Sequence, residues 1–277
     1  MSKRVFPFTQ GGVSGAAIQV AEADTWDLNK VLPVEHRREG DATVSFTYAC
    51  ACIAHGDHHV MVDGGWESEE IVDSLANLGV NPSEIDLVLI THGDGDHVLG
   101  LLTEDRTLTY PNANYVMHQD LWDFWHDNRA LAELPEDRRT LLAALATSME
   151  PRLTLFHDEH EVCEGIRAIP CPGHRQGHCT YEFATEEAPI HHFGDTLFHP
   201  LLAQHPDWPD RMAYDPPAEA ASRRRTLERA ASTGALVMTA HIAFPGIGRI
   251  ERAAPHSDDA NGATYRWTPI QSAPEDA

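Results

Sequence analysis

The run from Thr91 to His97, Thr-His-Gly-Asp-Gly-Asp-His, places two imidazoles and two carboxylates close together in the chain. It directly follows residues 85–90, an apolar stretch that is typical of a buried strand. Carboxylates are rarely buried unless they are paired or bind a metal, and the two glycines would let the loop turn tightly. A polar surface turn would also tolerate these residues. We favour a metal site at the end of a strand, because other segments supply matching ligands.

Three later residues extend this candidate site, each of them after an apolar stretch. His174 lies in Pro-Gly-His-Arg-Gln-Gly-His, Asp195 follows Phe-Gly, and His241 follows Thr-Ala. A carboxylate can bridge two metals, because each of its oxygens can serve one ion. Taken alone, each residue would favour an ordinary structural role, such as a helix cap for Asp195. In the segment Pro-Gly-His-Arg-Gln-Gly-His, we expect the second histidine, His178, to hold the loop and not to bind metal.

Together these motifs resemble those of the metallo-β-lactamase superfamily. They are His-x-Asp-x-Asp-His, Pro-Gly-His-x-x-Gly-His, Gly-Asp and Ala-His-x-x-Phe-Pro-Gly, in that order. The resemblance covers roughly residues 40–270, and the late segments resemble acyl-homoserine lactonases and methyl-parathion-hydrolase-like enzymes. It implies one domain over residues 1–277 with an αββα sandwich fold: two mixed sheets face to face, helices outside, and the metals in a cleft at one edge. Residues 272–277 are expected to be a disordered tail.

The resemblance also implies a set of metal ligands. These are His92, Asp94 and His174 for a first ion, Asp96, His97 and His241 for a second ion, and Asp195 between them. Asp63 would support the ligand loop. We expect two divalent ions, and zinc above other metals. Iron and manganese are alternatives, because Asp94 stands where the family has histidine and a carboxylate is a harder ligand than imidazole.

The implied activity is hydrolysis of an ester, a lactone or a related small-molecule bond by a metal-bound hydroxide, with Asp96 moving the proton. The lactonases have a tyrosine where this chain has Phe198, which cannot donate a hydrogen bond. This argues against their usual activity and makes His199, or another polar group in the cleft, the candidate substitute. Two alternatives are a carboxylate-rich iron site with redox or dioxygenase-type chemistry, and a non-catalytic metal-binding relative. Aromatic residues expected around the cleft are Trp122, Trp125, Phe198, Trp208 and Phe244.

Composition limits the partners and the location. The chain has 43 acidic and 20 basic residues and a formal net charge of −23, which disfavours nucleic acid and anionic lipid. No stretch approaches the roughly 18 apolar residues of a membrane helix, and no apolar block follows the first basic residues. The five cysteines form no Cys-x-x-Cys pair. We therefore expect a cytoplasmic enzyme that acts on a small molecule, with a homodimer suggested by the related hydrolases.

The hydrophobic pattern predicts the elements that would carry these loops. Strands are expected at residues 44–52, 59–63, 85–90, 113–118, 153–156, 166–170, 179–184, 190–193 and 235–239. Helices are expected at residues 67–79, 119–134, 136–149 and 216–232. Residues 249–251 and 264–267 are expected to pair with each other. The candidate ligands then recur at strand ends, where rigid strands hold converging loops.

Overall fold

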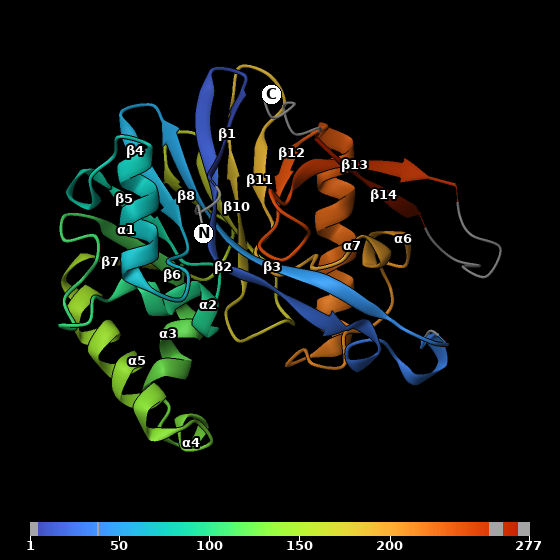
Figure 1. Cartoon of the computed structure of the whole chain (residues 1–277), viewed down its shortest axis with the longest axis horizontal. Coiled ribbons are helices and arrows are strands. Elements are labelled where there is room, and N and C mark those ends of the chain that lie inside the picture. The colour runs from blue at the N-terminus through green and yellow to red at the C-terminus, as the bar shows by residue number, and fades with distance from the viewer. Residues whose placement is uncertain (1–4, 38, 255–262, 271–277) are drawn as a thin grey trace.

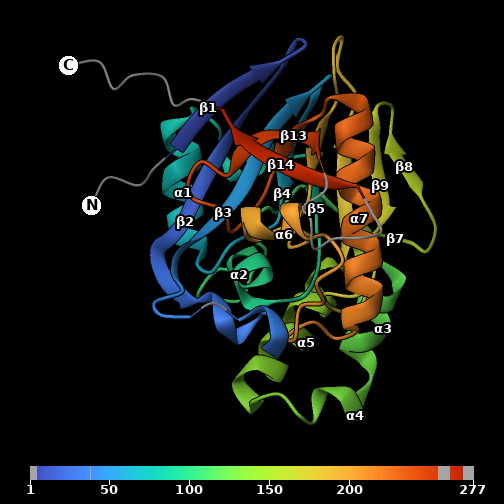
Figure 2. The same ribbon diagram turned by 90° about the vertical axis from the view of Figure 1, so that its right-hand side faces the viewer.

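Two mixed sheets of seven strands each lie face to face, and helices cover their outer faces (Figure 1). The arrangement comes from a computed structural model, which describes residues 5–37, 39–254 and 263–270. Seen from the side, α7 runs along the outside of the second sheet (Figure 2). This is the αββα sandwich that the motifs imply. The expected tail, residues 272–277, lies outside the described residues.

The first sheet joins an antiparallel half to a parallel half. Its strands, in spatial order, are β1 (Val5–Gln10), β2 (Val13–Asp27), β3 (Thr43–His55), β4 (His58–Val62), β5 (Leu87–Leu89), β6 (Asn114–His118) and β7 (Leu153–Phe156). Pairing is antiparallel from β1 to β4 and parallel from β4 to β7. The parallel half therefore sends the loops that follow its strands to one edge.

The second sheet is antiparallel except at its centre. Its strands are β8 (His160–Cys163), β9 (Ile166–Pro170), β10 (Cys179–Phe183), β11 (Ile190–His192), β12 (Leu236–Met238), β13 (Ile247–Ala253) and β14 (Thr264–Pro269). Only the β11–β12 pair is parallel among these described strands. The loops that follow β11 and β12 consequently leave the sheet at the same edge.

Seven α-helices and five short 3₁₀ helices connect the described strands. The α-helices are α1 (Ser68–Asn77), α2 (Gly95–Val98), α3 (Gln119–His126), α4 (Asn128–Leu131), α5 (Glu136–Met149), α6 (Pro200–Gln204) and α7 (Pro216–Thr233). The 3₁₀ helices are η1 (Leu28–Lys30), η2 (Val34–His36), η3 (Pro82–Glu84), η4 (Leu99–Leu101) and η5 (Glu150–Arg152). None of these helices is both long and apolar enough to cross a bilayer.

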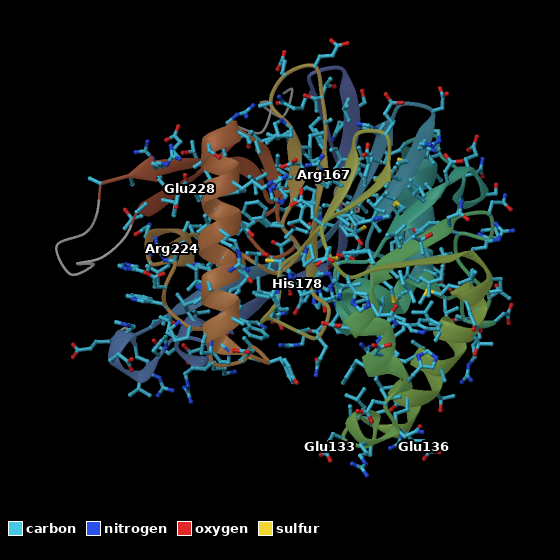
Figure 3. The ribbon with its side chains drawn as sticks, turned by 180° about the vertical axis from the view of Figure 1, so that it is seen from behind. Glu133, Glu136, Arg167, His178, Arg224 and Glu228 are labelled. Atoms are coloured by element: carbon cyan, nitrogen blue, oxygen red, sulfur yellow. The ribbon has the colours of Figure 1, made fainter. Side chains whose placement is uncertain are left out.

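Apolar side chains fill three layers. Alternate residues of β3, such as Ile53, share the layer between the sheets with Phe183 of β10. The intervening Cys50 and Cys52 belong to the layer under α1 and α5, because successive side chains of a strand point to opposite faces. A third layer lies under α6 and α7. Glu228 projects from α7 (Figure 3) and accepts a hydrogen bond from the hydroxyl of Tyr265 in β14, 2.9 Å away.

The predicted elements are confirmed at most positions, with four differences. The first sheet begins earlier than expected, because residues 5–27 form β1 and β2. The helix expected over residues 119–134 is broken at Asp127, whose side chain accepts from the backbone N–H groups of Arg129 and Ala130 and so starts α4. The strand β8 and the helix α6 were not predicted. The expected pairing of residues 249–251 with 264–267 is observed between β13 and β14.

Candidate metal centre

The candidate ligands lie on loops and a short helix that follow strands. His92 comes shortly after β5, and α2 then carries Asp96 and His97. Because β11 and β12 are parallel neighbours, Asp195 and His241 emerge at the same edge of the second sheet. The candidate centre therefore lies where one edge of the first sheet meets one edge of the second sheet.

The turn that carries His174, between β9 and β10, depends on a glycine. Gly173 has a φ of +131°, and a Cβ atom there would lie 2.1 Å from the backbone nitrogen of Glu219. Such a contact is impossible without moving α7, so only glycine fits. The close approach of this turn to α7 sets the position of His174 next to the β11 loop.

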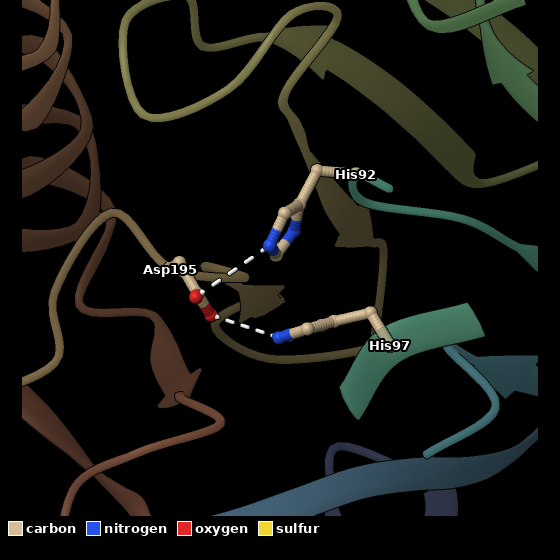
Figure 4. Close-up of side chains that lie close together, drawn as sticks. All are labelled: His92, His97 and Asp195. Carbon is tan, nitrogen blue, oxygen red and sulfur yellow. Dashed lines mark ion pairs between the residues drawn. The ribbon is translucent and has the colours of Figure 1, made fainter. Parts of the chain in front are cut away.

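Asp195 is the central carboxylate of the site. Its Oδ2 lies 3.6 Å from Nε2 of His92, 3.3 Å from Nε2 of His174 and 3.0 Å from Nε2 of His241. Its Oδ1 lies 3.3 Å from Nε2 of His97. Figure 4 shows the imidazoles of His92 and His97 pointing at different oxygens of this one carboxylate. Asp195 thus touches imidazoles from both halves of the site.

The candidate ligand atoms form two further groups. Within each group, the atoms lie within 4.8 Å of one another. These groups are His92 with Asp94 and His174, and Asp96 with His97 and His241. The Oδ2 atom of Asp94 is 3.7 Å from Nε2 of both His92 and His174. The structure therefore brings all seven predicted residues together, in the two sets that the resemblance implies.

Several buried atoms of the site lack a hydrogen-bond partner among the described residues. They are Nε2 of His92, His97 and His174, and Oδ1 of Asp195. Buried polar atoms are nearly always satisfied in folded proteins, so such a convergence needs an explanation. Imidazole nitrogens and carboxylate oxygens are ligands of divalent cations such as zinc. The donor set therefore fits a pair of divalent cations.

Asp63 orients the first ligand loop from behind. It follows β4, has a φ of +64°, and accepts hydrogen bonds through Oδ1 from the backbone N–H of Thr91 and through Oδ2 from Nδ1 of His97, both at 2.8 Å. Because Nδ1 of His97 is engaged, Nε2 is the atom left to face the site. Carboxylates that bind the far nitrogen of a ligating histidine commonly fix its ring in this way.

Three more hydrogen bonds hold the candidate ligands that come from the second sheet. Nδ1 of His241 donates to the carbonyl of Thr47 at 2.8 Å, which again leaves Nε2 toward the site. His178 accepts from the backbone N–H of Asp195 at 3.1 Å, and its other nitrogen donates to the carbonyl of Cys171 at 3.0 Å. His178 thus ties the His174 turn to the Asp195 loop, the role expected for it.

The family model of the metallo-beta-lactamase superfamily matches residues 46–241, a range that contains all seven clustered residues. The chain belongs to this superfamily. Among curated proteins it is similar to metallo-beta-lactamase domain-containing protein 1 of Xenopus laevis, with 33% identity over 72 residues. That match covers 25% of this chain and spans 28% of the relative's length.

Solved structures of metallo-beta-lactamase-fold hydrolases superpose on nearly the whole chain. The dizinc quorum-quenching lactonase AidC, solved with its product, has 18% identity and a TM-score of 0.80 and covers 97% of this chain and 98% of its own. The hydrolase AbOPH has 21% identity and a TM-score of 0.80, with coverage of 98% and 99%. At these identities the likeness shows the fold.

Charge balance in this metallo-beta-lactamase site keeps the carboxylates ionised. Burial disfavours the charged form of Asp195, but the imidazoles of His241, His97 and His92 outweigh burial and lower its pKa well below the usual value. Conversely, burial lowers the pKa of His174, while the adjacent carboxylates of Asp195 and Asp94 raise it to about 9. In both cases the site favours positive charge next to its carboxylates.

A pocket of about 310 Å³ opens directly onto the centre. Polar residues of the centre form its floor, and its walls are mainly aromatic and apolar: Trp26, Val31, Phe46, Tyr48, Trp66, Phe198 and Met212. Of the five aromatic residues expected around the cleft, Phe198 lines the pocket. Trp122 and Trp125 pack in the layer under α5, Trp208 packs in the layer under α6, and Phe244 packs between the sheets.

His199 occupies a different position from the one predicted. Its Nδ1 accepts from the backbone N–H of Leu201 at 3.1 Å and so caps α6, and it is absent from the residues that line the pocket. A role for His199 at the substrate therefore has no support in this geometry.

Among the polar side chains that line the pocket, sequence reasoning missed three: Tyr48, Arg175 and Asp210. Nε of Arg175 lies 2.9 Å from each oxygen of Asp94. One signal was available for Arg175, because it directly follows a candidate ligand, His174.

Proposed function

We propose that this chain is a dinuclear metal-dependent hydrolase that cleaves an ester, a lactone or a related bond in an uncharged small molecule. One observation carries the proposal: Asp195 stands between two groups of three ligands, and every group faces the same pocket. The dizinc lactonase among the similar structures supports it, since that protein is a dizinc enzyme with the same fold.

In this proposal His92, Asp94 and His174 hold one ion, and Asp96, His97 and His241 hold the other, with Asp195 shared. Two divalent cations, zinc in our proposal, would supply Lewis acidity toward a carbonyl oxygen and lower the pKa of a water ligand from roughly 15.7 toward about 7. Iron and manganese are the alternatives, because Asp94 contributes a hard oxygen.

The protein's own residues do the remaining work. Asp96 lines the pocket, and its Oδ2 lies 3.4 Å from Nε2 of both His97 and His241. Burial raises the pKa of Asp96, but the adjacent imidazoles lower it on balance, so the carboxylate is available to accept a proton and return it to the departing oxygen. The aromatic walls exclude water and accept the apolar part of the substrate.

The experiment is a hydrolysis screen on protein of known metal content. We expect turnover of uncharged aryl esters or lactones that ends on chelation with EDTA and returns when zinc is restored. The variant Asp195→Asn, which keeps the shape of the side chain and removes its charge, should lose at least about 100-fold in kcat, an effect comparable with loss of a key electrostatic group. A metal-loaded wild-type protein without turnover on aryl esters, lactones, thioesters or phosphotriesters would contradict the proposal.

We also propose that the enzyme is cytoplasmic, in a reducing compartment. We propose further that it is a homodimer and that it acts on a small molecule. The described part of the chain contains five free cysteines, four of them buried, which supports a reducing compartment. Sedimentation analysis tests the dimer, and a single species with the mass of one chain would exclude it.

A further inference from the structure

Hydrolysis of an ester or a lactone builds negative charge on oxygen, and a fixed hydrogen-bond donor in the pocket stabilises that charge. The described residues that line the pocket include one hydroxyl group, on Tyr48 of β3. Phe198 offers no donor. Arg175 is already engaged, because its NH1 donates to the carbonyls of His174 at 2.8 Å and Met212 at 3.0 Å and its Nε faces Asp94.

Tyr48 lies directly beside the centre. Its ring meets the imidazole of His241 edge to face, with centroids 5.6 Å apart and planes at 86°. A second edge-to-face contact, at 6.0 Å, joins it to Trp66 across the pocket wall. Tyr48 also lines the same pocket as Asp96, Asp195 and His241 of the candidate centre. Its side chain therefore faces the space that a substrate at the centre would occupy.

Neighbouring aromatic rings hold the Tyr48 side chain in the pocket wall. The ring of Tyr48 meets Phe46 edge to face, with centroids 5.5 Å apart, and Trp26, at the end of β2, lines the same pocket. The ring of Trp26 is itself held by stacking on Phe46, with centroids 4.7 Å apart and planes at 15°. Among the described residues no acceptor is recorded for the phenol proton.

We propose that Tyr48 is a catalytic residue of this hydrolase, whose hydroxyl donates a hydrogen bond to the oxygen of the scissile ester or lactone group on which negative charge develops. The inference rests on the proposed function and narrows its substrate class. The charged groups of the pocket are carboxylates, the imidazoles of the candidate ligands, and Arg175, which is already bound to Asp94. An anionic substituent on the substrate would therefore have no cationic partner there. The preferred substrate is therefore a neutral acyl compound with an apolar portion.

The phenol keeps its proton under working conditions. A tyrosine hydroxyl ordinarily has a pKa of about 10, so it carries its proton at neutral pH. Tyr48 is consequently a donor throughout the neutral range. The surrounding rings of Phe46, Trp66 and Phe198 exclude water from the donor, which strengthens its hydrogen bond in the transition state.

The test is steady-state kinetics of Tyr48→Phe on an uncharged aryl ester and a lactone, with metal content measured on the same samples. We expect kcat to fall about 100-fold, as for loss of one oxyanion donor, with KM changed less than about threefold and the metal content of wild type. The matched control Tyr214→Phe removes an equivalent hydroxyl from an exposed side chain that does not line this pocket, and should have wild-type kinetics.

Three results would overturn the role of Tyr48 while leaving the hydrolase proposal intact. They are an unchanged kcat in Tyr48→Phe, a change confined to KM, and a loss of kcat explained by loss of metal. Failure of the wild-type protein itself, fully loaded, to hydrolyse any of the esters or lactones would instead contradict the proposed function, and the role of Tyr48 with it.

Discussion

Asp94 has a shorter side chain than the histidine of the family pattern, and the surrounding residues compensate for it. Nε of Arg175 lies 2.9 Å from both of its oxygens and holds the carboxylate toward His92 and His174. Burial alone would raise the pKa of Asp94, but the two adjacent imidazoles, together with the charge of Arg175, lower this pKa well below the usual value. The candidate position for the first metal is therefore built around an ionised carboxylate.

From the carboxylate of Asp94 we predict the metal preference of the first position. Replacing it in Asp94→His supplies a softer nitrogen ligand, so the ratio of zinc to manganese bound under equimolar competition should rise several-fold. Elemental analysis of the dialysed protein measures the ratio. The variant Asp105→His, which adds a histidine at an exposed loop position, is the matched control. An unchanged ratio in Asp94→His would show that this side chain does not ligate.

At the residue scale, the sequence was sufficient to predict which candidate ligands cluster, and insufficient to predict the residues of the pocket wall. His92, Asp195 and the other clustered residues could be identified because each stands in a short motif after a strand. Tyr48 could not, because in the sequence it is one of several alternating residues of β3 and nothing local distinguishes it. The pairing of β3 with β2 brings Tyr48 and Trp26 to the same pocket, and the local sequence does not reveal that pairing.

Among the elements, the β1–β2 hairpin was the largest omission. Its turn is Gly11-Gly12, both with positive φ values, between strands that pair from Val5 with Ile18 to Gln10 with Val13. Two glycines at such a turn are a recognised hairpin signal. The short β8 had a weaker signal, since it is a partly exposed edge strand.

The element β11 makes the fold sensitive to acid. It carries His191 and His192, both buried, and burial is the main cause that lowers the pKa of each from 6.5 to about 4. Between these two values the unfolded chain takes up a proton on each imidazole and the native chain does not. The free energy of unfolding therefore falls as the pH falls through this range, by about 1.4 kcal/mol per pH unit for each histidine.

Denaturant unfolding between pH 6 and pH 4.5 tests this expectation. His191→Gln removes one of the two titrating groups, so its free energy of unfolding should depend less steeply on pH than that of wild type, by about 1.4 kcal/mol per unit. His58→Gln, at an exposed position, is the control and should keep the wild-type slope. Loss of metal in acid affects all three proteins alike. Equal slopes for wild type and His191→Gln would refute the assignment.

At the scale of the whole molecule, the centre joins the two sheets. The ligands from His92 to His97 belong to the first sheet, whereas His174, Asp195 and His241 follow strands of the second. Each bound cation would thus connect the halves of the sandwich and offset part of a formal net charge of −23. Because ligands that bind only the native state stabilise it, metal binding and folding are coupled in this account.

The most direct test is the number of divalent ions bound per chain, measured by elemental analysis after reconstitution with zinc and removal of free metal. The account predicts about two ions for the wild-type protein and fewer than about one for Asp195→Asn, because the shared carboxylate contributes to both positions. A wild-type protein that retains no ion, or an Asp195→Asn variant that retains both, would contradict it.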